Sequence, residues 1–158
     1  MSDKAIGQIL VGLDGSDGSV AALRRAIQLA KAMDAEVVAV HVFQVPYPAV
    51  APVAGGAPMG VGAEVTSYEQ SMRESVKEVF RTQWCAPLEE AGVRHREVFG
   101  EGPAGPVLEE AAERDNVDLI VVGRRGRSSL AEFLAGSVSQ YLVHRASRPV
   151  LVVPHPSE

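Results

Sequence analysis

The chain has a single cysteine, three lysines and no long apolar run among its 158 residues. The lone cysteine, Cys85, excludes an internal disulfide bond and a metal site built from several cysteines. No segment approaches the ~20 consecutive apolar residues that are needed to cross a bilayer. The first residues also lack the cationic head and long apolar core of a secretory signal. We therefore expect a cytoplasmic protein.

Positive charge is scarce as well. Fifteen lysines and arginines face twenty acidic residues, which gives a formal net charge of -5 at pH 7. This balance argues against nucleic acid or an anionic membrane as a partner. One segment differs, because residues 123–148 contain five arginines and one acidic residue, Glu132. A basic segment in an acidic chain indicates a small anionic ligand rather than a polymer.

Several familiar site patterns find no match. No Walker A sequence occurs, and Gly12-x-x-Gly15-x-x-Gly18 does not fit the Rossmann fingerprint. The four histidines are scattered and suggest no metal site. His41 lies inside an apolar run, so we expect a hydrogen-bonded core residue there. Cys85, beside Trp84 on a predicted helix, is expected to pack rather than to act as a nucleophile.

Short apolar runs rich in β-branched residues alternate with longer segments of helical periodicity. Strands are predicted at residues 6–13, 36–43, 93–99, 118–122 and 149–153. The alternation predicts an α/β fold, with one open five-stranded parallel sheet and helices on both faces. The length and the ordinary composition, 46% hydrophobic and 22% charged, favour a single domain over residues 1–158.

The middle of the chain combines a loop and a long helix. Residues 44–63 contain four prolines and four glycines, which predicts a flexible surface loop or, alternatively, a lid. A helix is predicted over residues 66–90, with a bend or restart at Pro87. Its expected core face comprises Tyr68, Met72, Val76, Val79, Phe80 and Leu88. The strand at 93–99 alternates in polarity, so we expect it near a sheet edge.

Two loops look suited to a ligand. After the fourth predicted strand, Gly123, Gly126, Gly136 and Ser137 have the spacing Gly-x2-Gly-x9-Gly-Ser. Glycine allows close approach of the backbone to a ligand, and a helix that begins here would offer free N–H groups to a phosphate. After the first predicted strand, Asp14 either meets the ligand or caps the next helix. If these strands are neighbours, both loops flank one crevice beyond the strands' carboxyl ends.

The segments ILVGLDGS, VVAVHVF and DLIVVGRRGRSSLAEFLAGSVSQYLVHRASRPVLVV resemble the universal stress protein family. The likeness spans nearly the whole chain except the loop at about 44–63. It implies a Rossmann-like fold of the adenine nucleotide alpha hydrolase type, with strand order 3-2-1-4-5. It also implies ATP binding in members that keep the glycine motif, and homodimers formed through the fifth strand, 149–153. An exposed apolar edge strand is an association hazard that such pairing would cover.

The resemblance assigns residues to an ATP site, with Mg²⁺ or Mn²⁺ as the accompanying ion. Leu13 and Asp14 would lie beside the adenosine, with Asp14 near the ribose or the metal, and Val42 would meet the adenine. The residues expected around the ribose and phosphates are Gly123, Gly126, Gly136, Ser137, Val138 and Ser139. Arg124 and Arg125 depart from the commonest members; they either clamp the triphosphate or extend into solvent, and we expect Arg125 to be a phosphate contact.

Two further expectations concern the cap and the chemistry. Ser137 and Gln140 are predicted to form a capping box at the start of the last helix. No residue of the motif supplies an evident general base, so we expect no catalytic residues and slow or absent ATP hydrolysis. The chain would then act as a nucleotide-dependent stress-response regulator or sensor.

Three alternative functions stay open. An enzyme of adenylyl or pyrophosphate chemistry would need further acids or lysines at the loop, and the lysines (Lys4, Lys31 and Lys77) lie elsewhere. A phosphoreceiver-like domain would need a lysine late in the chain. A dimeric interaction protein with a vestigial pocket would not need the intact glycine motif.

Overall fold

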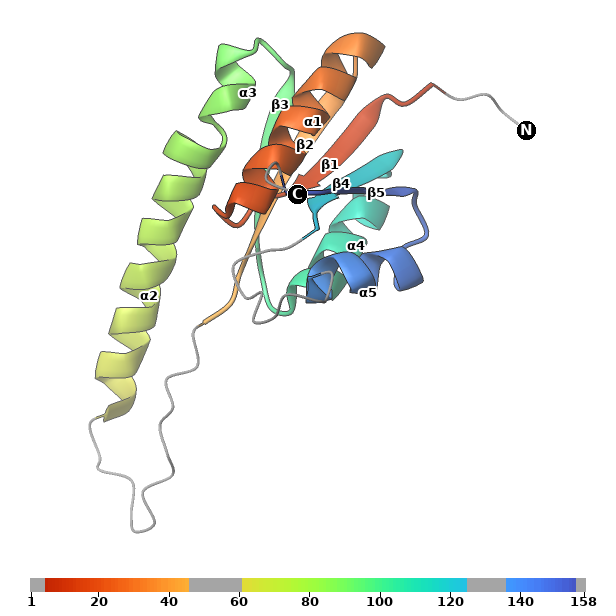
Figure 1. Cartoon of the computed structure of the whole chain (residues 1–158). Coiled ribbons are helices and arrows are strands. Elements are labelled where there is room, and N and C mark those ends of the chain that lie inside the picture. Colours follow the sequence, from red (N-terminus) through yellow and green to blue (C-terminus); the bar gives the residue numbers. More distant parts are fainter. Residues whose placement is uncertain (1–4, 46–60, 125–135, 156–158) are drawn as a thin grey trace.

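Five parallel strands form one sheet in the computed structural model, which describes residues 5–45, 61–124 and 136–155 (Figure 1). The strands are β1 (Gln8–Gly12), β2 (Glu36–Phe43), β3 (His95–Glu101), β4 (Leu119–Gly123) and β5 (Val150–Val153). Their order is β3-β2-β1-β4-β5, and every neighbouring pair is parallel. The expected number, direction and order of the strands are therefore confirmed.

Helices cover both faces of the sheet, as predicted. The helical elements are α1 (Asp17–Met33), α2 (Val61–Val79), the π-helical turn η1 (Phe80–Trp84), α3 (Ala86–Glu90), α4 (Ala104–Arg114) and α5 (Ser137–Arg145). One core holds apolar residues of α1, η1 and α3, and the other holds those of α4 and α5. No helix in the described ranges is both long and apolar enough to cross a membrane.

Alternate residues of the central strands enter the two cores. In β2, Val37 and Ala39 lie in the core beneath α1, while Val38 and Val40 lie in the core beneath α4. All four are at most 1% exposed. A strand covered on both faces has no polar side to present, which explains why its sequence is almost continuously apolar.

The third strand lies two residues later than predicted, over His95–Glu101 rather than 93–99. Val93 belongs to the turn after α3, where its N–H donates to the Leu88 carbonyl at 3.1 Å. The strand then continues through Gly100, which pairs with Val42 and so uses the full length of β2. The prediction that this strand lies at an edge is confirmed.

The long predicted helix is divided and begins earlier than expected. The chain is helical from Val61, so residues 61–63 of the predicted loop belong to α2, while 46–60 lie outside the described residues. The predicted restart at Pro87 is confirmed, since this proline lies in the first turn of α3. Tyr68 was assigned to the core wrongly, because it is 64% exposed. The amino-terminal half of α2 extends beyond the sheet (Figure 1).

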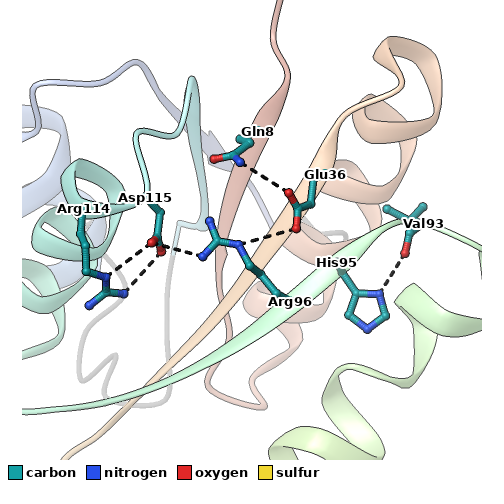
Figure 2. Close-up of polar contacts among 7 residues, drawn as sticks. All are labelled: Gln8, Glu36, Val93, His95, Arg96, Arg114 and Asp115. Carbon is teal, nitrogen blue, oxygen red and sulfur yellow. Dashed lines mark hydrogen bonds and ion pairs between the residues drawn. The ribbon is translucent and has the colours of Figure 1, made fainter.

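Charged side chains join the elements at the amino-terminal edge of the sheet (Figure 2). Arg96 of β3 lies 3.6 Å from Glu36 of β2 and 3.2 Å from Asp115, which comes directly after α4. Gln8 of β1 donates a 3.4 Å hydrogen bond to Glu36. Arg114 also lies 3.4 Å from Asp115. One arginine therefore links an edge strand to its neighbour and to the opposite helical layer.

Asp115 is the most enclosed acid of this network, with 11% of its side chain exposed. Burial raises the pKa of its carboxyl, but the hydrogen bonds and charges of Arg114 and Arg96 outweigh burial and hold the pKa below its ordinary value of 3.8. The ionised form of Asp115 is therefore the form that the folded structure favours.

Candidate functional site

The carboxyl ends of β1 and β4 lie side by side at the point where the strand order reverses. β1 pairs with β2 on one side and with β4 on the other, with Leu10 opposite Ile120. The helix after β1 covers one face, whereas the helix before β4 covers the other. Ligands of open α/β sheets bind at such a reversal. The expected adjacency of the two loops is confirmed.

The loop after β1 is held by its own hydrogen bonds. Leu13 is 4% exposed, and its N–H donates to the Val40 carbonyl at 2.8 Å. The Asp14 Oδ1 atom accepts from the N–H of Ser16 at 2.9 Å and from its hydroxyl at 2.5 Å. Ser16 caps α1 by accepting from the N–H of Ser19 at 3.2 Å. Asp14 therefore supports the helix cap through one of its oxygens.

The loop after β4 approaches the start of α1 closely. A Cβ atom on Gly123 would lie 2.6 Å from the carbonyl carbon and oxygen of Gly18. Both neighbours are backbone atoms of a helix and cannot move aside cheaply. Packing against α1 is thus a reason for glycine at this position that sequence reasoning did not foresee. The packing places the end of β4 against the first turn of α1, the helix that follows the Asp14 loop.

The ends of the segment between β4 and α5 are tied to each other. The N–H of Gly136 donates to the carbonyl of Arg124 at 2.6 Å. Ser139 is 2% exposed, and its hydroxyl lies 3.0 Å from the Arg124 carbonyl and 2.8 Å from that of Gly136. The Ser139 hydroxyl therefore donates to backbone carbonyls and not to solvent. Two predicted site residues, Arg125 and Gly126, lie outside the described residues.

The amino terminus of α5 carries no side-chain cap within the described part of the chain. Gly136 occupies the cap position, and Ser137 is the exposed first residue of the helix. The predicted capping box is therefore wrong: a box needs its hydroxyl residue one position before the helix, and here that residue is glycine. The predicted start of the helix is right. Its first N–H groups have no intrahelical acceptor, which suits them to an anion.

The two predicted valines line the α4 side of the sheet. Val42 lies near the end of β2, partly buried and opposite Gly100 of β3. Val138, in the first turn of α5, packs against the same core as Val42. These side chains offer an apolar surface beside the carboxyl ends of the strands.

Of the five arginines of residues 123–148, the three that the structure describes, Arg124, Arg145 and Arg148, do not form one patch. Arg148 donates a 2.8 Å hydrogen bond to Asn116, which precedes β4, so it lies at the amino-terminal edge of the sheet. Arg145 is the last residue of α5, and Arg124 is exposed directly after β4. Proximity in sequence does not make Arg124 a neighbour of the other two, because α5 carries the chain across the sheet between them.

Sequence reasoning overlooked a further glycine pattern. Gly100, Gly102 and Gly105 match the spacing Gly-x-Gly-x-x-Gly between β3 and α4. Local geometry accounts for each of them: a Cβ on Gly100 would lie 2.7 Å from Val107, and one on Gly105 would lie 2.6 Å from the Tyr141 ring. Gly102 has a φ of +118°. The pattern comes after an edge strand and is explained by packing.

His41 and Cys85 are buried core residues, as expected. His41 is 7% exposed and lies 2.6 Å from the Leu13 carbonyl, a contact that no sequence pattern indicated. Cys85 is buried, and burial together with Glu97 and Glu89 raises its pKa to about 12. It is therefore a thiol at neutral pH. Among the described residues, no cluster of three or more metal-ligating side chains occurs.

An open groove of about 570 Å³ lies beside edge strand β3. It is lined by Lys77, Phe80, Arg81, His95, Arg96, Glu97 and Phe99. Its arginines already have acidic partners, since Arg81 lies 3.2 Å from Glu97 and Arg96 belongs to the network of Figure 2. Because those charges are neutralised, the groove is a weaker anion site than the loops at β1 and β4.

Relatives match along almost the whole chain. A family model described as Universal stress protein family matches residues 6–154. The chain is 36% identical over 153 residues to universal stress protein MJ0531 of Methanocaldococcus jannaschii. The match covers 96% of this chain and 84% of that protein. It is 34% identical over 154 residues to universal stress protein YxiE of Bacillus subtilis, with 92% and 97% covered.

Solved structures share the fold. Universal stress protein UspA from Lactobacillus plantarum has a TM-score of 0.74 at 21% identity, over 96% of this chain and 99% of that one. A universal stress protein in complex with cAMP has a TM-score of 0.61 at 27% identity, over 96% and 98%. A family protein from Arabidopsis thaliana with AMP bound has a TM-score of 0.60 at 16% identity, over 96% and 93%.

Proposed function

The chain belongs to the universal stress protein family, and we propose that it binds ATP where β1 and β4 end. In this proposal the nucleotide makes the protein a regulator or sensor in a stress response. The observation that carries the proposal is the packing of Gly123, where the glycine-motif loop begins, against Gly18 in the first turn of α1, so close that a Cβ atom on Gly123 would lie 2.6 Å from the Gly18 backbone. Structural relatives that bind cAMP and AMP support an adenine nucleotide as the ligand class.

Each part of the proposed site has a distinct task. The N–H groups at the start of α5 bind phosphate oxygens, with Ser137 and Val138 contributing directly. Leu13 lies beside the adenosine, and Val42 provides apolar surface for it. Gly126 leaves room for the phosphates, and Arg125 contacts them. Ser139 acts indirectly, because its hydroxyl ties the two ends of the loop together.

A magnesium or manganese ion fits this residue set only together with the nucleotide. Mg²⁺ is commonly held by one or two carboxylates along with substrate phosphates, rather than by a cage of protein ligands. Asp14 supplies one carboxylate at the loop after β1, and no larger acidic cluster occurs among the described residues. When bound with ATP, the ion would neutralise phosphate charge.

We infer slow or absent hydrolysis. Phosphoryl transfer to water needs a group that positions or deprotonates the water. One carboxylate oxygen of Asp14 already accepts a hydrogen bond from Ser16, and the Ser139 hydroxyl is hydrogen-bonded to backbone carbonyls. Steady turnover above a few per second, within the usual enzyme range, would overturn this part of the proposal.

A homodimer through β5 and a cytoplasmic location remain predictions. β5 is an edge strand, and Val150, Leu151 and Val152 are partly exposed on it. Pairing with a second copy would cover these residues. Light scattering at micromolar concentration with nucleotide present should give twice the mass of one chain, and a monomer would contradict the prediction.

The decisive experiment identifies what the purified protein binds. Mass spectrometry and chromatography of released small molecules should detect an adenine nucleotide, and titration calorimetry should show saturable binding of magnesium ATP. Gly126→Val should lose most of the thermal stabilisation by magnesium ATP. Gly7→Val is the matched control, because Gly7 is exposed at the opposite edge of the sheet. Equal stabilisation of both variants would show that the glycine motif does not hold the phosphates.

A further inference from the structure

A cluster of aromatic rings lies directly behind the Asp14 loop. Its centre is His41 of β2, with ring centroids 5.0 Å from Trp84, 5.5 Å from Phe99 and 5.9 Å from Phe80. The Trp84 ring meets His41 edge-on, at 75°. Such contacts fix the orientation of a buried imidazole. The cluster therefore gives the ring a defined direction toward the loop.

His41 binds the backbone of that loop. Its Nδ1 atom lies 2.6 Å from the Leu13 carbonyl oxygen. A carbonyl can only accept, so Nδ1 carries the proton and donates it. The N–H of Leu13 is bound as well, to the Val40 carbonyl at 2.8 Å. Both polar backbone groups of Leu13, the residue before Asp14, are thus held by β2.

Trp84 holds the other side of Asp14. Gly15 has a φ of +76°, and a Cβ atom there would lie 2.5 Å from Cζ2 and 2.7 Å from Cε2 of the Trp84 ring. The indole therefore rests against the Gly15 backbone with no room for a side chain between them. Asp14 lies between two residues, Leu13 and Gly15, that the aromatic cluster contacts.

The π-helical turn explains how Trp84 reaches this position. The N–H of Cys85 donates to the carbonyl of Phe80 at 3.0 Å, a bond that spans five residues instead of four. One inserted residue rotates the next part of the helix by about 100° around the helix axis. Such turns occur frequently at functional sites. Here the turn allows Phe80 to enter the core while Trp84 lies against the loop.

We infer that His41 and Trp84 are positioning residues for the nucleotide: they hold the Leu13-Asp14-Gly15 backbone in its binding geometry before the ligand arrives. This inference rests on the proposed ATP site. A loop that is already ordered loses less conformational entropy when it binds, so its affinity is higher. Neither side chain needs to touch the nucleotide, and both act through the backbone on either side of Asp14.

The test removes each contact and measures two quantities. His41→Phe keeps a ring but removes the donor, whereas His41→Asn retains an N–H close to the position of Nδ1. Trp84→Phe shortens the ring that covers Gly15. Leu88→Val is the control, because Leu88 is fully buried in the same core but is not one of the aromatic rings around His41. All variants are titrated with magnesium ATP at a temperature where each is folded.

We expect His41→Phe and Trp84→Phe to bind magnesium ATP about tenfold more weakly than wild type, His41→Asn to recover most of the loss, and Leu88→Val to match wild type. Without nucleotide, the Ser16 amide, which donates to Asp14, should exchange its hydrogen about tenfold faster in His41→Phe and Trp84→Phe than in Leu88→Val. Wild-type affinity and unchanged exchange in both ring variants would overturn the inference.

The two proposals fail in different ways. If wild type does not bind ATP, the proposed function fails, and Ser16 exchange alone decides whether His41 and Trp84 hold the loop. If wild type binds ATP and the control loses as much affinity as the ring variants, only the positioning role fails. Loss of affinity in His41→Asn equal to that in His41→Phe would also overturn the role of the Nδ1 donor.

Discussion

At the amino-terminal edge of the sheet, charged side chains pair with one another, whereas beyond the carboxyl ends of β1 and β4 glycines and serines hold the backbone. Arg96 forms ion pairs with both Glu36 and Asp115, which come from three different parts of the fold (Figure 2). At the opposite edge, Asp14 and Ser139 bind backbone groups of their own loops. The first arrangement neutralises charge and stabilises the fold. The second orders loops and leaves the N–H groups of α5 without a side-chain cap.

The comparison separates stability from binding. A substitution at the amino-terminal edge should change the free energy of unfolding and leave ATP affinity unaltered. A substitution at the carboxyl-terminal edge should alter affinity, with or without a change in stability.

The largest effect is expected from Gly123→Ala. The new Cβ would lie 2.6 Å from backbone atoms of Gly18, so the loop and α1 must separate. We expect a loss of about 1–3 kcal/mol in the free energy of unfolding, as in other overpacked sites, and a loss of ATP affinity. Urea unfolding measures the free energy of unfolding, and titration calorimetry measures the ATP affinity. Gly7→Ala is the control, because its Cβ would meet Asp118 at an ordinary 3.7 Å; equal effects of both changes would contradict the explanation.

Arg96→Met tests the amino-terminal edge. It leaves Glu36 without its arginine and Asp115 with Arg114 alone, and because Arg96 and Glu36 are 39% and 30% exposed we expect a loss of about 1 kcal/mol in the free energy of unfolding. ATP affinity should stay at the wild-type value. Arg94→Met removes a surface arginine whose partner, Asp34, is 97% exposed, and should cost less than about 0.5 kcal/mol. A drop in affinity with Arg96→Met would break the division between the two edges.

Ser139→Ala should have a moderate effect on both quantities. It removes a buried hydroxyl that joins Arg124 to Gly136, which costs about 1 kcal/mol of stability. ATP affinity should also fall, since the loop ends are no longer tied. Ser137→Ala changes an exposed hydroxyl that makes no cap, and its stability in urea should match wild type. A larger stability loss with Ser137→Ala would reverse the assigned roles.

The smallest expected effect is the contribution of Asp115 to the acid dependence of the free energy of unfolding. The folded-state pKa of Asp115 lies below 3.8, its ordinary value, so the unfolded state binds the proton more readily. The stability that its ionised form contributes is present above that value and is lost as the pH falls through the folded-state pKa. Urea unfolding of wild type and Asp115→Asn should converge as the pH falls below about 4. Curves that stay parallel would remove Asp115 as a source of acid sensitivity.

Part of this architecture was readable in the sequence. The apolar run 36–43 coincides with β2, because a strand buried on both faces has an unmistakable composition. The third strand was misplaced by two residues, because the apolar Val93 belongs to the turn after α3 and not to the strand. Tyr68 has the right spacing for a core face, but spacing does not reveal that its half of α2 extends beyond the sheet (Figure 1).

The candidate site shows the same division. Spacing in the chain singled out Gly123, Gly126, Gly136 and Ser137, and the resemblance added Ser139. Neither predicted that Gly123 packs on Gly18 or that Ser139 bonds inward, because those contacts depend on how β4 lies beside β1 and α1. The expected basic segment 123–148 does not become one patch. Arg148 belongs to the same segment of the sequence as Gly123 but lies at the other end of the sheet.

The sequence by itself determined the alternation of strands and helices, the glycine motif and the family, since these depend on local composition and on fixed spacing. Only the tertiary structure decided which side chains support the Asp14 loop. His41 lies 28 positions from Leu13, and Trp84 is farther still from Gly15. The order of the strands and the π-helical turn bring them together, because contacts between distant residues depend on how elements pack and not on the spacing within any one of them.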